Sequence, residues 1–222
     1  MLYKNNMKQP GLMGTNPGKH SKGFTIIELM IATTVFSIIL LLVTYGILQI
    51  GRTYYKGVTE TKTQDTARAA LDNITQAIQF DSGAVSAQSN GIVPNVKYVI
   101  CIGNVRYSAY LGHILIDDST HHALVQDTES TPCADNTAIP GLDGSTPMSS
   151  SATELMAPLM RVAALDVTDL SGGLYKVHIR VVYGNDVDLV NPTTLTASCD
   201  GGQINQFCAV SDLTTTVEKR VN

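Results

Sequence analysis

Lys22-Gly23-Phe24-Thr25-Ile26-Ile27-Glu28-Leu29-Met30-Ile31-Ala32 is the stretch that decides the fold. A polar leader ends at Gly23, and an apolar run begins at Phe24 and continues to about Ile50. Within residues 26–43, Glu28 is the only charged side chain. Because about 20 mostly apolar residues suffice to cross about 30 Å of hydrocarbon, the run predicts a transmembrane helix. A carboxylate at the centre of a bilayer costs on the order of 3 kcal/mol or more, so Glu28 needs a physical reason.

The motif Gly-Phe-Thr-x-x-Glu-Leu-Met-x-Ala after a short basic leader resembles the N-terminus of a type IV prepilin or a type II secretion pseudoprepilin. In that family a membrane-bound prepilin peptidase cuts after the glycine and methylates the new terminal amine, usually of phenylalanine. The glutamate four residues after that phenylalanine serves filament assembly. The resemblance therefore implies cleavage between Gly23 and Phe24, with Glu28 as the assembly residue.

Cleavage would also give Glu28 a partner. Phe24 would carry a cationic amine, and Glu28 lies near the first helical turn, where unpaired N–H groups favour negative charge. In a bundle of such helices, Glu28 of one subunit would neutralise the Phe24 amine of its neighbour, and removing one member of such a buried pair is strongly destabilising. The alternative is that Glu28 lies near the membrane interface and merely reaches the water.

The leader, residues 1–23, is not an ordinary secretory signal. It carries four lysines and turn-forming sequences but no apolar core, and the apolar run follows the expected cut, so the mature protein keeps its membrane helix. Positive charge stays cytoplasmic, which places the C-terminal portion outside. Removing the leader's lysines leaves 11 basic against 19 acidic residues. An acidic outer portion argues against unspecific nucleic-acid binding.

The helix is expected to continue beyond the membrane. Residues 24–50 form its transmembrane and assembly half, and residues 51–82 form a polar half that ends at Asp81-Ser82-Gly83. No proline interrupts residues 24–80, and one apolar stripe repeats at three- and four-residue steps. Its members are Ala67, Ala70, Leu71, Ile74, Ala77 and Ile78. Three glycines (Gly46, Gly51 and Gly57) either weaken the helix or only relieve crowding.

Residues 83–222 predict a β-rich outer domain. Short β-branched or aromatic runs begin at Val96, Val105 and His113, with a further run starting at His122. A loop-like insertion occupies residues 127–152. Two later runs, 160–168 and 174–183, are expected to make a hairpin about Gly172-Gly173. The second run alternates with period two, which predicts a half-buried strand.

Together these elements predict an α+β class. A long helix followed by an antiparallel sheet resembles the pilin fold, in which the sheet packs on the outer half of the helix. The late hairpin and the short C-terminal tail resemble the larger minor pilins and the J-type pseudopilins more than the small major subunits.

Four cysteines, all beyond the membrane helix, favour disulfides, and four cysteines allow three connectivities. Pilins often pin a C-terminal loop with such a bond, so the resemblance implies Cys199–Cys208, which leaves Cys101–Cys133. A metal site is the alternative, although no C-x-x-C pair is present.

Other candidate ligands are weak. His121 and His122 cannot easily bind one ion together, because neighbouring residues on a strand face opposite sides. Both are therefore expected to be solvated. Acids at Asp117-Asp118 and in Asn185-Asp186-Val187-Asp188 offer oxygens for calcium, but they are also typical of turns after strands. No G-x-S-x-G, P-loop or H-E-x-x-H motif occurs, so we expect neither an enzyme nor a cofactor.

The leading hypothesis is a structural subunit, most similar to a minor pilin, of a type IV pilus-like filament. Its expected partners are the prepilin peptidase, the cytoplasmic membrane, other pilins in a homo- or hetero-polymer, and the assembly platform. It would cross the membrane once, with its N-terminus cytoplasmic, before entering an extracellular or periplasmic filament with a role such as adhesion or secretion. The alternatives are a type II secretion pseudopilin, a DNA-uptake pilin, or a signal-anchored binding or enzymatic ectodomain.

Overall fold

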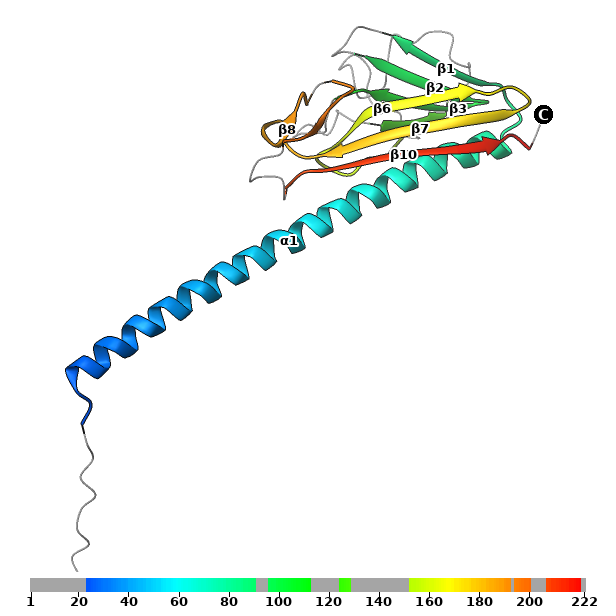
Figure 1. Cartoon of the computed structure of the whole chain (residues 1–222). Helices are drawn as coiled ribbons and strands as arrows, with labels where there is room; N and C mark the ends of the chain where they lie inside the picture. The colour runs from blue at the N-terminus through cyan, green and yellow to red at the C-terminus, as the bar shows by residue number, and fades with distance from the viewer. Residues whose placement is uncertain are drawn as a thin grey trace, which may run out of the picture. The chain divides into compact units, whose positions relative to one another are not determined.

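The computed structural model describes residues 23–90, 96–112, 124–128, 152–192, 194–200 and 207–220. It confirms the predicted α+β class, with one long N-terminal helix followed by antiparallel strands (Figure 1). The chain divides into two units between Ile47 and Leu48. The first contains the apolar start of the helix, and the second contains the rest of the helix with the sheets.

The helix α1 spans Ile26–Phe80. Threonine and serine hydroxyls along the helix donate hydrogen bonds to backbone carbonyls of the preceding turn. Thr34 donates to Met30 (2.6 Å), and Thr44 donates to Leu40 (2.8 Å). The helix stops where predicted. The Asp81 carboxylate accepts a bond from the Gly83 N–H at 2.7 Å, which turns the backbone out of the helical path.

The strands form three antiparallel sheets. The order in the five-stranded sheet is β1-β2-β3-β4-β5, with bounds Val85–Asn90, Lys97–Ile102, Val105–Tyr110, Leu124–Thr128 and Thr153–Glu154. The order in the three-stranded sheet is β10-β7-β6, with bounds Ala209–Glu218, Leu174–Tyr183 and Met160–Asp169. A short 3-10 helix η1 (Asp186–Asp188) leads into the pair β8 (Leu189–Val190) and β9 (Ser198–Cys199).

The main core lies between the second half of α1 and the two larger sheets. Five of the six residues of the predicted apolar stripe are buried, and the sixth, Ala77, is half-buried against the same core. The core face of β7 supplies alternating residues such as Val177 and Ile179, and β6 supplies Val162 and Leu165 on either side of a register shift between Val162 and Ala164. The stripe therefore is the surface that the sheets cover, as the 3.6-residue period predicted.

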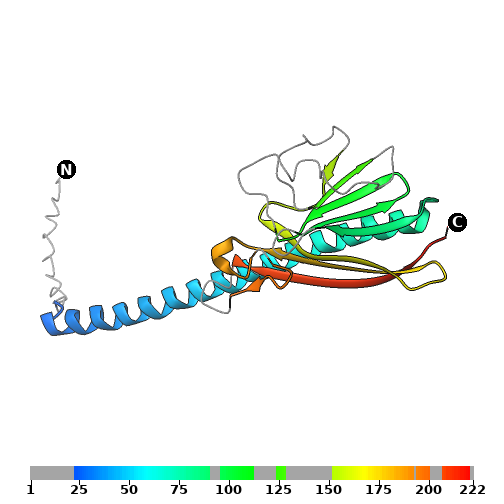
Figure 2. The same ribbon diagram turned by 90° about the horizontal axis from the view of Figure 1, so that it is seen from above.

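The hairpin β6–β7 also appears as predicted, with Gly172 and Gly173 at positive φ in its turn. The C-terminal segment, by contrast, is not the short tail that the sequence predicted. Residues 209–218 form a ten-residue strand, β10, that pairs with β7 along its whole length (Figure 2). Strands β1, β5, β8 and β9 were not predicted, and the run expected from His113 lies outside the described residues.

A second, smaller core lies on the opposite face of the β10-β7-β6 sheet. It consists of Ala163, Val182, Leu189, Ala197 and Cys208. The segment that supplies Leu189 and Ala197, residues 186–192 and 194–200, is called the β8–β9 lobe below. The lobe therefore covers the end of the sheet where β7 finishes and β10 begins.

A buried arginine holds this lobe in place. The Arg161 guanidinium donates to the carbonyls of Gly112 (3.3 Å), Pro192 (2.9 Å) and Gly184 (3.2 Å), and to the Asp186 carboxylate (2.7 Å). Burial lowers the pKa of Arg161, and the hydrogen bond and charge of Asp186 act in the opposite direction. Losing the side chain would leave several buried acceptors unpaired, so Arg161 ties three loops to one strand.

Tyr107 provides a pH-dependent test of the helix–sheet contact. Its buried hydroxyl donates to the Asn73 side-chain oxygen at 2.6 Å, and burial, then the charge of Asp81, raise its pKa from 10.0 to about 12. A raised phenol pKa stabilises the fold fully below pH 10, and this contribution is lost as the pH rises toward 12. We expect Tyr107→Phe to lower the free energy of unfolding by about 1 kcal/mol at pH 7. Wild type should lose stability on the order of 2 kcal/mol between pH 10 and pH 12, and Tyr107→Phe should lack this loss.

The measurement is the free energy of unfolding of the detergent-solubilised chain at pH 7, 10 and 12. Tyr55→Phe is the matched control, because its ring is exposed and the same hydroxyl is deleted without loss of a buried contact. Parallel pH curves for wild type and Tyr107→Phe above pH 10 would contradict the role of Tyr107.

Candidate assembly site

The N-terminal turn of α1 brings together the residues that the sequence singled out. Gly23, Phe24 and Thr25 precede the helix in non-helical backbone, so the Gly23–Phe24 bond lies outside it. Phe24 is 82% exposed, and nothing lies within 4 Å of the position that a Cβ at Gly23 would take. This peptide bond is therefore accessible to a protease.

Glu28 and Thr25 form a capping box, which the sequence analysis missed. The Glu28 N–H donates to the Thr25 hydroxyl oxygen (3.3 Å), and the Thr25 N–H and hydroxyl both donate to Glu28 Oε2 (3.4 Å). The Thr-x-x-Glu spacing at the start of the apolar run was the signal that could have revealed it. The pair satisfies donors that the first turn of a helix otherwise leaves without partners.

The capping box leaves Glu28 capacity for a further partner. Both donors use Oε2 at long distances, and no described residue donates to Oε1. The carboxylate is exposed and faces the positive end of the helix dipole. An ammonium group would bind it more strongly than these neutral donors, because both partners of that contact would then carry a charge.

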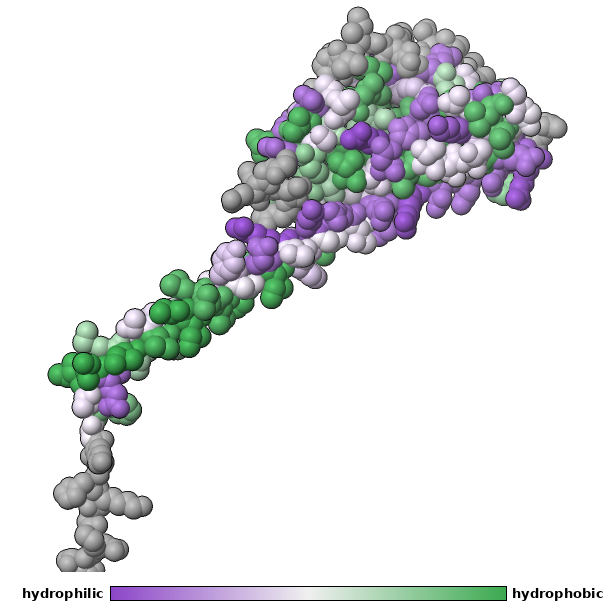
Figure 3. Space-filling model, viewed as in Figure 1, coloured by the Kyte–Doolittle hydropathy of each residue, from purple (hydrophilic) through white to green (hydrophobic). Residues whose placement is uncertain are grey.

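The first half of α1 has the surface of a membrane span. Residues 26–44 are all exposed, and apolar side chains dominate this part of the surface (Figure 3). The helix is long and apolar enough to cross a bilayer. Water is a poor solvent for such a surface, so its burial against lipid or other apolar surfaces is favourable.

Two cysteines join the end of the β8–β9 lobe to the start of β10. Cys199 and Cys208 form a disulfide, with Cα atoms 5.6 Å apart. Cys101, on β2, is also disulfide-bonded, and Cys133 lies outside the described residues. The Cys199–Cys208 bond closes the segment beside the second core, in which Cys208 is buried.

The other candidate ligands do not gather into a site within the part of the chain that is described. His121, His122, Asp117 and Asp118 lie outside it. Asp186 pairs with Arg161, while a carboxylate oxygen of Asp188 accepts a bond from the Asn185 amide at 3.4 Å. The described residues hold no group of three or more His, Cys, Asp or Glu arranged to bind a metal.

Comparison with known proteins adds one finding. Residues 18–44 match the family model for the prokaryotic N-terminal methylation motif. This match includes Gly23, Phe24, Thr25 and Glu28, and it supports the type IV prepilin and pseudopilin family, whose motif is structural rather than enzymatic. No curated protein and no solved structure matches the chain.

Proposed function

We propose that the chain is a structural subunit, of the minor-pilin kind, of a type IV pilus-like filament. In this proposal a prepilin peptidase cuts after Gly23 and methylates Phe24. The mature subunit then waits in the cytoplasmic membrane, with its globular domain outside, until the assembly platform adds it to other pilins. The work of such a subunit is packing, so the proposal includes no catalytic step.

The observation that carries the proposal is the N-terminal turn of α1. A matched methylation motif, an accessible Gly23–Phe24 bond and a carboxylate with an unused oxygen occur together at the start of an exposed apolar helix. Removing the leader would convert the Phe24 amide into a cation four residues before Glu28, in the first turn of α1. The amine of an incoming subunit would then be the charged partner of Oε1.

The globular domain supports the same function. Its main core is closed by the second half of α1, so the domain does not need the first half of the helix for its own packing. The first half is thereby left for lipid or neighbouring helices. We propose that the disulfides Cys199–Cys208 and Cys101–Cys133 stabilise this domain outside the cytoplasm, where thiols are oxidised.

Mass spectrometry of the N-terminal peptide tests the proposal. We expect protein isolated from the cell envelope to begin with N-methyl-Phe24, because the motif provides the glycine, the aromatic residue and the apolar helix. The precursor isolated from cells without the peptidase is the control and should keep residues 1–23. An intact N-terminus in peptidase-containing cells would instead support a signal-anchored ectodomain.

A further inference from the structure

Exposed apolar side chains gather at one end of the globular domain. Val187 is 81% exposed in η1, and Phe207 is 48% exposed next to the disulfide. The β8–β9 lobe and the first residues of β10 add three more exposed side chains, Val190, Leu195 and Val210. Burial of such side chains away from water is favourable, so a cluster of them predicts a partner.

The end of the domain that carries this cluster is fixed by hydrogen bonds. The Arg220 N–H donates to the Gln79 carbonyl at 3.1 Å, so the finish of β10 lies beside the last turn of α1. Ten residues of extended strand place Ala209, where β10 begins, about 30 Å away. Figures 1 and 2 agree that β8 lies at this other end, where α1 enters the domain.

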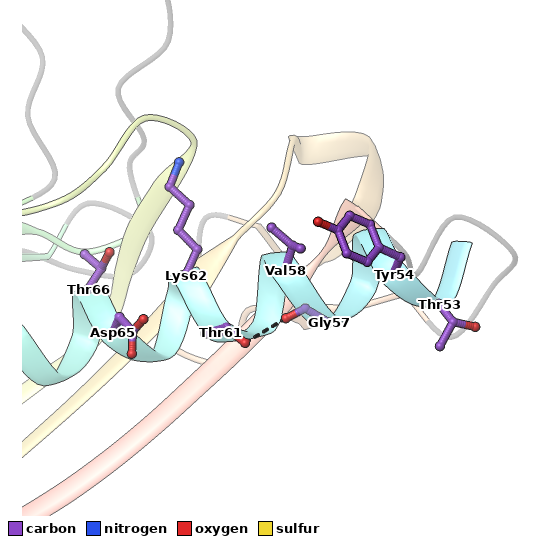
Figure 4. Close-up of a pocket in the computed structure, with 8 residues that line it drawn as sticks. All are labelled: Thr53, Tyr54, Gly57, Val58, Thr61, Lys62, Asp65 and Thr66. Atoms are coloured by element: carbon purple, nitrogen blue, oxygen red, sulfur yellow. Dashed lines mark hydrogen bonds between the residues drawn. The ribbon is translucent and has the colours of Figure 1, made fainter. Parts of the chain in front are cut away.

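The helix presents its own apolar and aromatic side chains at this end. Tyr54, Tyr55 and Val58 are exposed, with Tyr54 at 68%. An open groove of about 700 Å³ follows α1 from Thr53 to Thr66, where Tyr54 and Val58 line it together with polar side chains. Tyr54 and Val58 project from the same side of the helix into this region (Figure 4). Further along, the helix is buried from Thr63 onward at its core-facing positions.

The depth of these residues follows from the length of the apolar run. If the hydrocarbon ends at Ile50, Tyr54 lies four residues later, about 6 Å along the axis. The headgroup layer is about 5–8 Å thick on each side of the bilayer. Tyrosines are enriched in this layer because their rings are apolar and their hydroxyls are polar. Arg52, the first charge after Glu28, lies at the same level.

We infer that the membrane-proximal end of the globular domain docks onto the outer leaflet while the subunit waits in the bilayer. Val187 and Phe207 of the cluster insert among the lipid headgroups, and Tyr54 and Tyr55 anchor the helix beside them. The occupant is lipid because Tyr54 and Tyr55 follow the end of the apolar run at Ile50 by only four and five residues, which keeps this part of the unit within the headgroup layer. The inference rests on the proposed function only for insertion of the first half of α1.

The chain contains no tryptophan, which makes a single introduced tryptophan a specific probe. Val187→Trp and Phe207→Trp are placed in the full chain, reconstituted at one copy per nanodisc. In separate nanodiscs the lipid carries bromine either near the headgroup end or near the middle of its acyl chains, and bromine quenches tryptophan on contact. We expect both probes to emit at shorter wavelength than a water-exposed tryptophan and to lose most of their fluorescence in brominated lipid.

Two further variants make the outcome decisive. Leu174→Trp, at the exposed β6–β7 turn on the other end of the sheet, should stay unquenched, and Leu41→Trp, in the apolar half of α1, should be quenched. If Leu41→Trp is quenched but Val187→Trp and Phe207→Trp are not, docking is overturned while membrane insertion stands. If Leu41→Trp is also unquenched, insertion fails and docking fails with it.

A protein partner gives a different pattern. The probes would be unquenched at one copy per disc, and their emission would move to shorter wavelength only when two copies share a disc. This result would assign the surface to a second subunit and overturn docking onto lipid. The unfolding temperature of Val187→Trp and Phe207→Trp should equal that of wild type, because both native side chains are largely exposed.

Discussion

Glu28→Ala is expected to accumulate as processed protein in the membrane and to disappear from sheared filaments. The substitution removes the carboxylate that would pair with the Phe24 amine of the incoming subunit, and that amine would then enter the bundle without a partner. Leaving one member of a buried ion pair unpaired reduces association by about 100-fold or more. The measurement compares the membrane and filament fractions of wild type and variant.

Glu28→Gln separates the charge from the helix cap. Glutamine still accepts the Thr25 N–H bond, because both Glu and Gln serve in a capping box, but it cannot neutralise an amine. We expect Glu28→Gln to be excluded from filaments like Glu28→Ala. Thr25→Ala removes the threonine side of the cap and keeps the charge, so it should be far better incorporated. Wild-type incorporation of Glu28→Gln would show that the cap, and not the charge, matters.

Gly23→Val is expected to leave the whole leader on the protein. A Cβ at residue 23 meets nothing within 4 Å in this chain, so the substitution does not disturb the subunit itself. Any effect must therefore arise in the subsite of the peptidase, which we expect to fit glycine closely. Mass spectrometry should find the unprocessed N-terminus in nearly all of the variant protein.

Gly46→Ala is the matched control for Gly23→Val, since it also adds a Cβ into open space but lies beyond the cleavage site. It should be cut and methylated as efficiently as wild type. Normal processing of Gly23→Val would remove Gly23 from the proposed recognition of the leader.

The long helix and its buried stripe could be predicted because they depend on local patterns. No proline interrupts α1, and its core-facing residues repeat with the helical period, so neither result needed knowledge of the tertiary structure. The β6–β7 hairpin was equally visible, because inward residues such as Val177 and Ile179 alternate with charged ones. The elements with the clearest periodicity were therefore predicted correctly.

Strand β10 was missed because its inward positions are not consistently apolar. Ser211 and Thr215 share the core-facing side with Leu213 and Val217, which weakens the period-two signal. The strand forms because ten residues pair with β7, a long-range contact that no local pattern encodes. The second core was invisible for a similar reason, since its small residues come from separate segments of the chain.

The hydrogen bonds of the N-terminal turn were predicted only in part. The motif singled out Gly23, Phe24 and Glu28 as candidates, but the hydrogen-bond partner of Glu28 within the chain, Thr25, was missed. The surface formed by Val187, Phe207 and Tyr54 was not predicted. Exposed apolar residues carry no sequence signature that separates them from buried ones, and only the fold shows that these lie at the same end.

The pairing of β10 with β7 also determines when the protein can finish folding. The ladder needs residues 209–218, and the tie from Arg220 to Gln79 joins the last residues of the chain to the end of the helix. During synthesis α1 therefore emerges long before its covering sheet is complete, and contacts of such high sequence separation form late. A chain that stalls before Ala209 exposes the unpaired edge of β7, which is a template for aggregation. Synthesis of residues 209–218 is thus a folding step, and a truncation that removes residues 209–222 should yield insoluble protein even though α1 and the β6–β7 hairpin are intact.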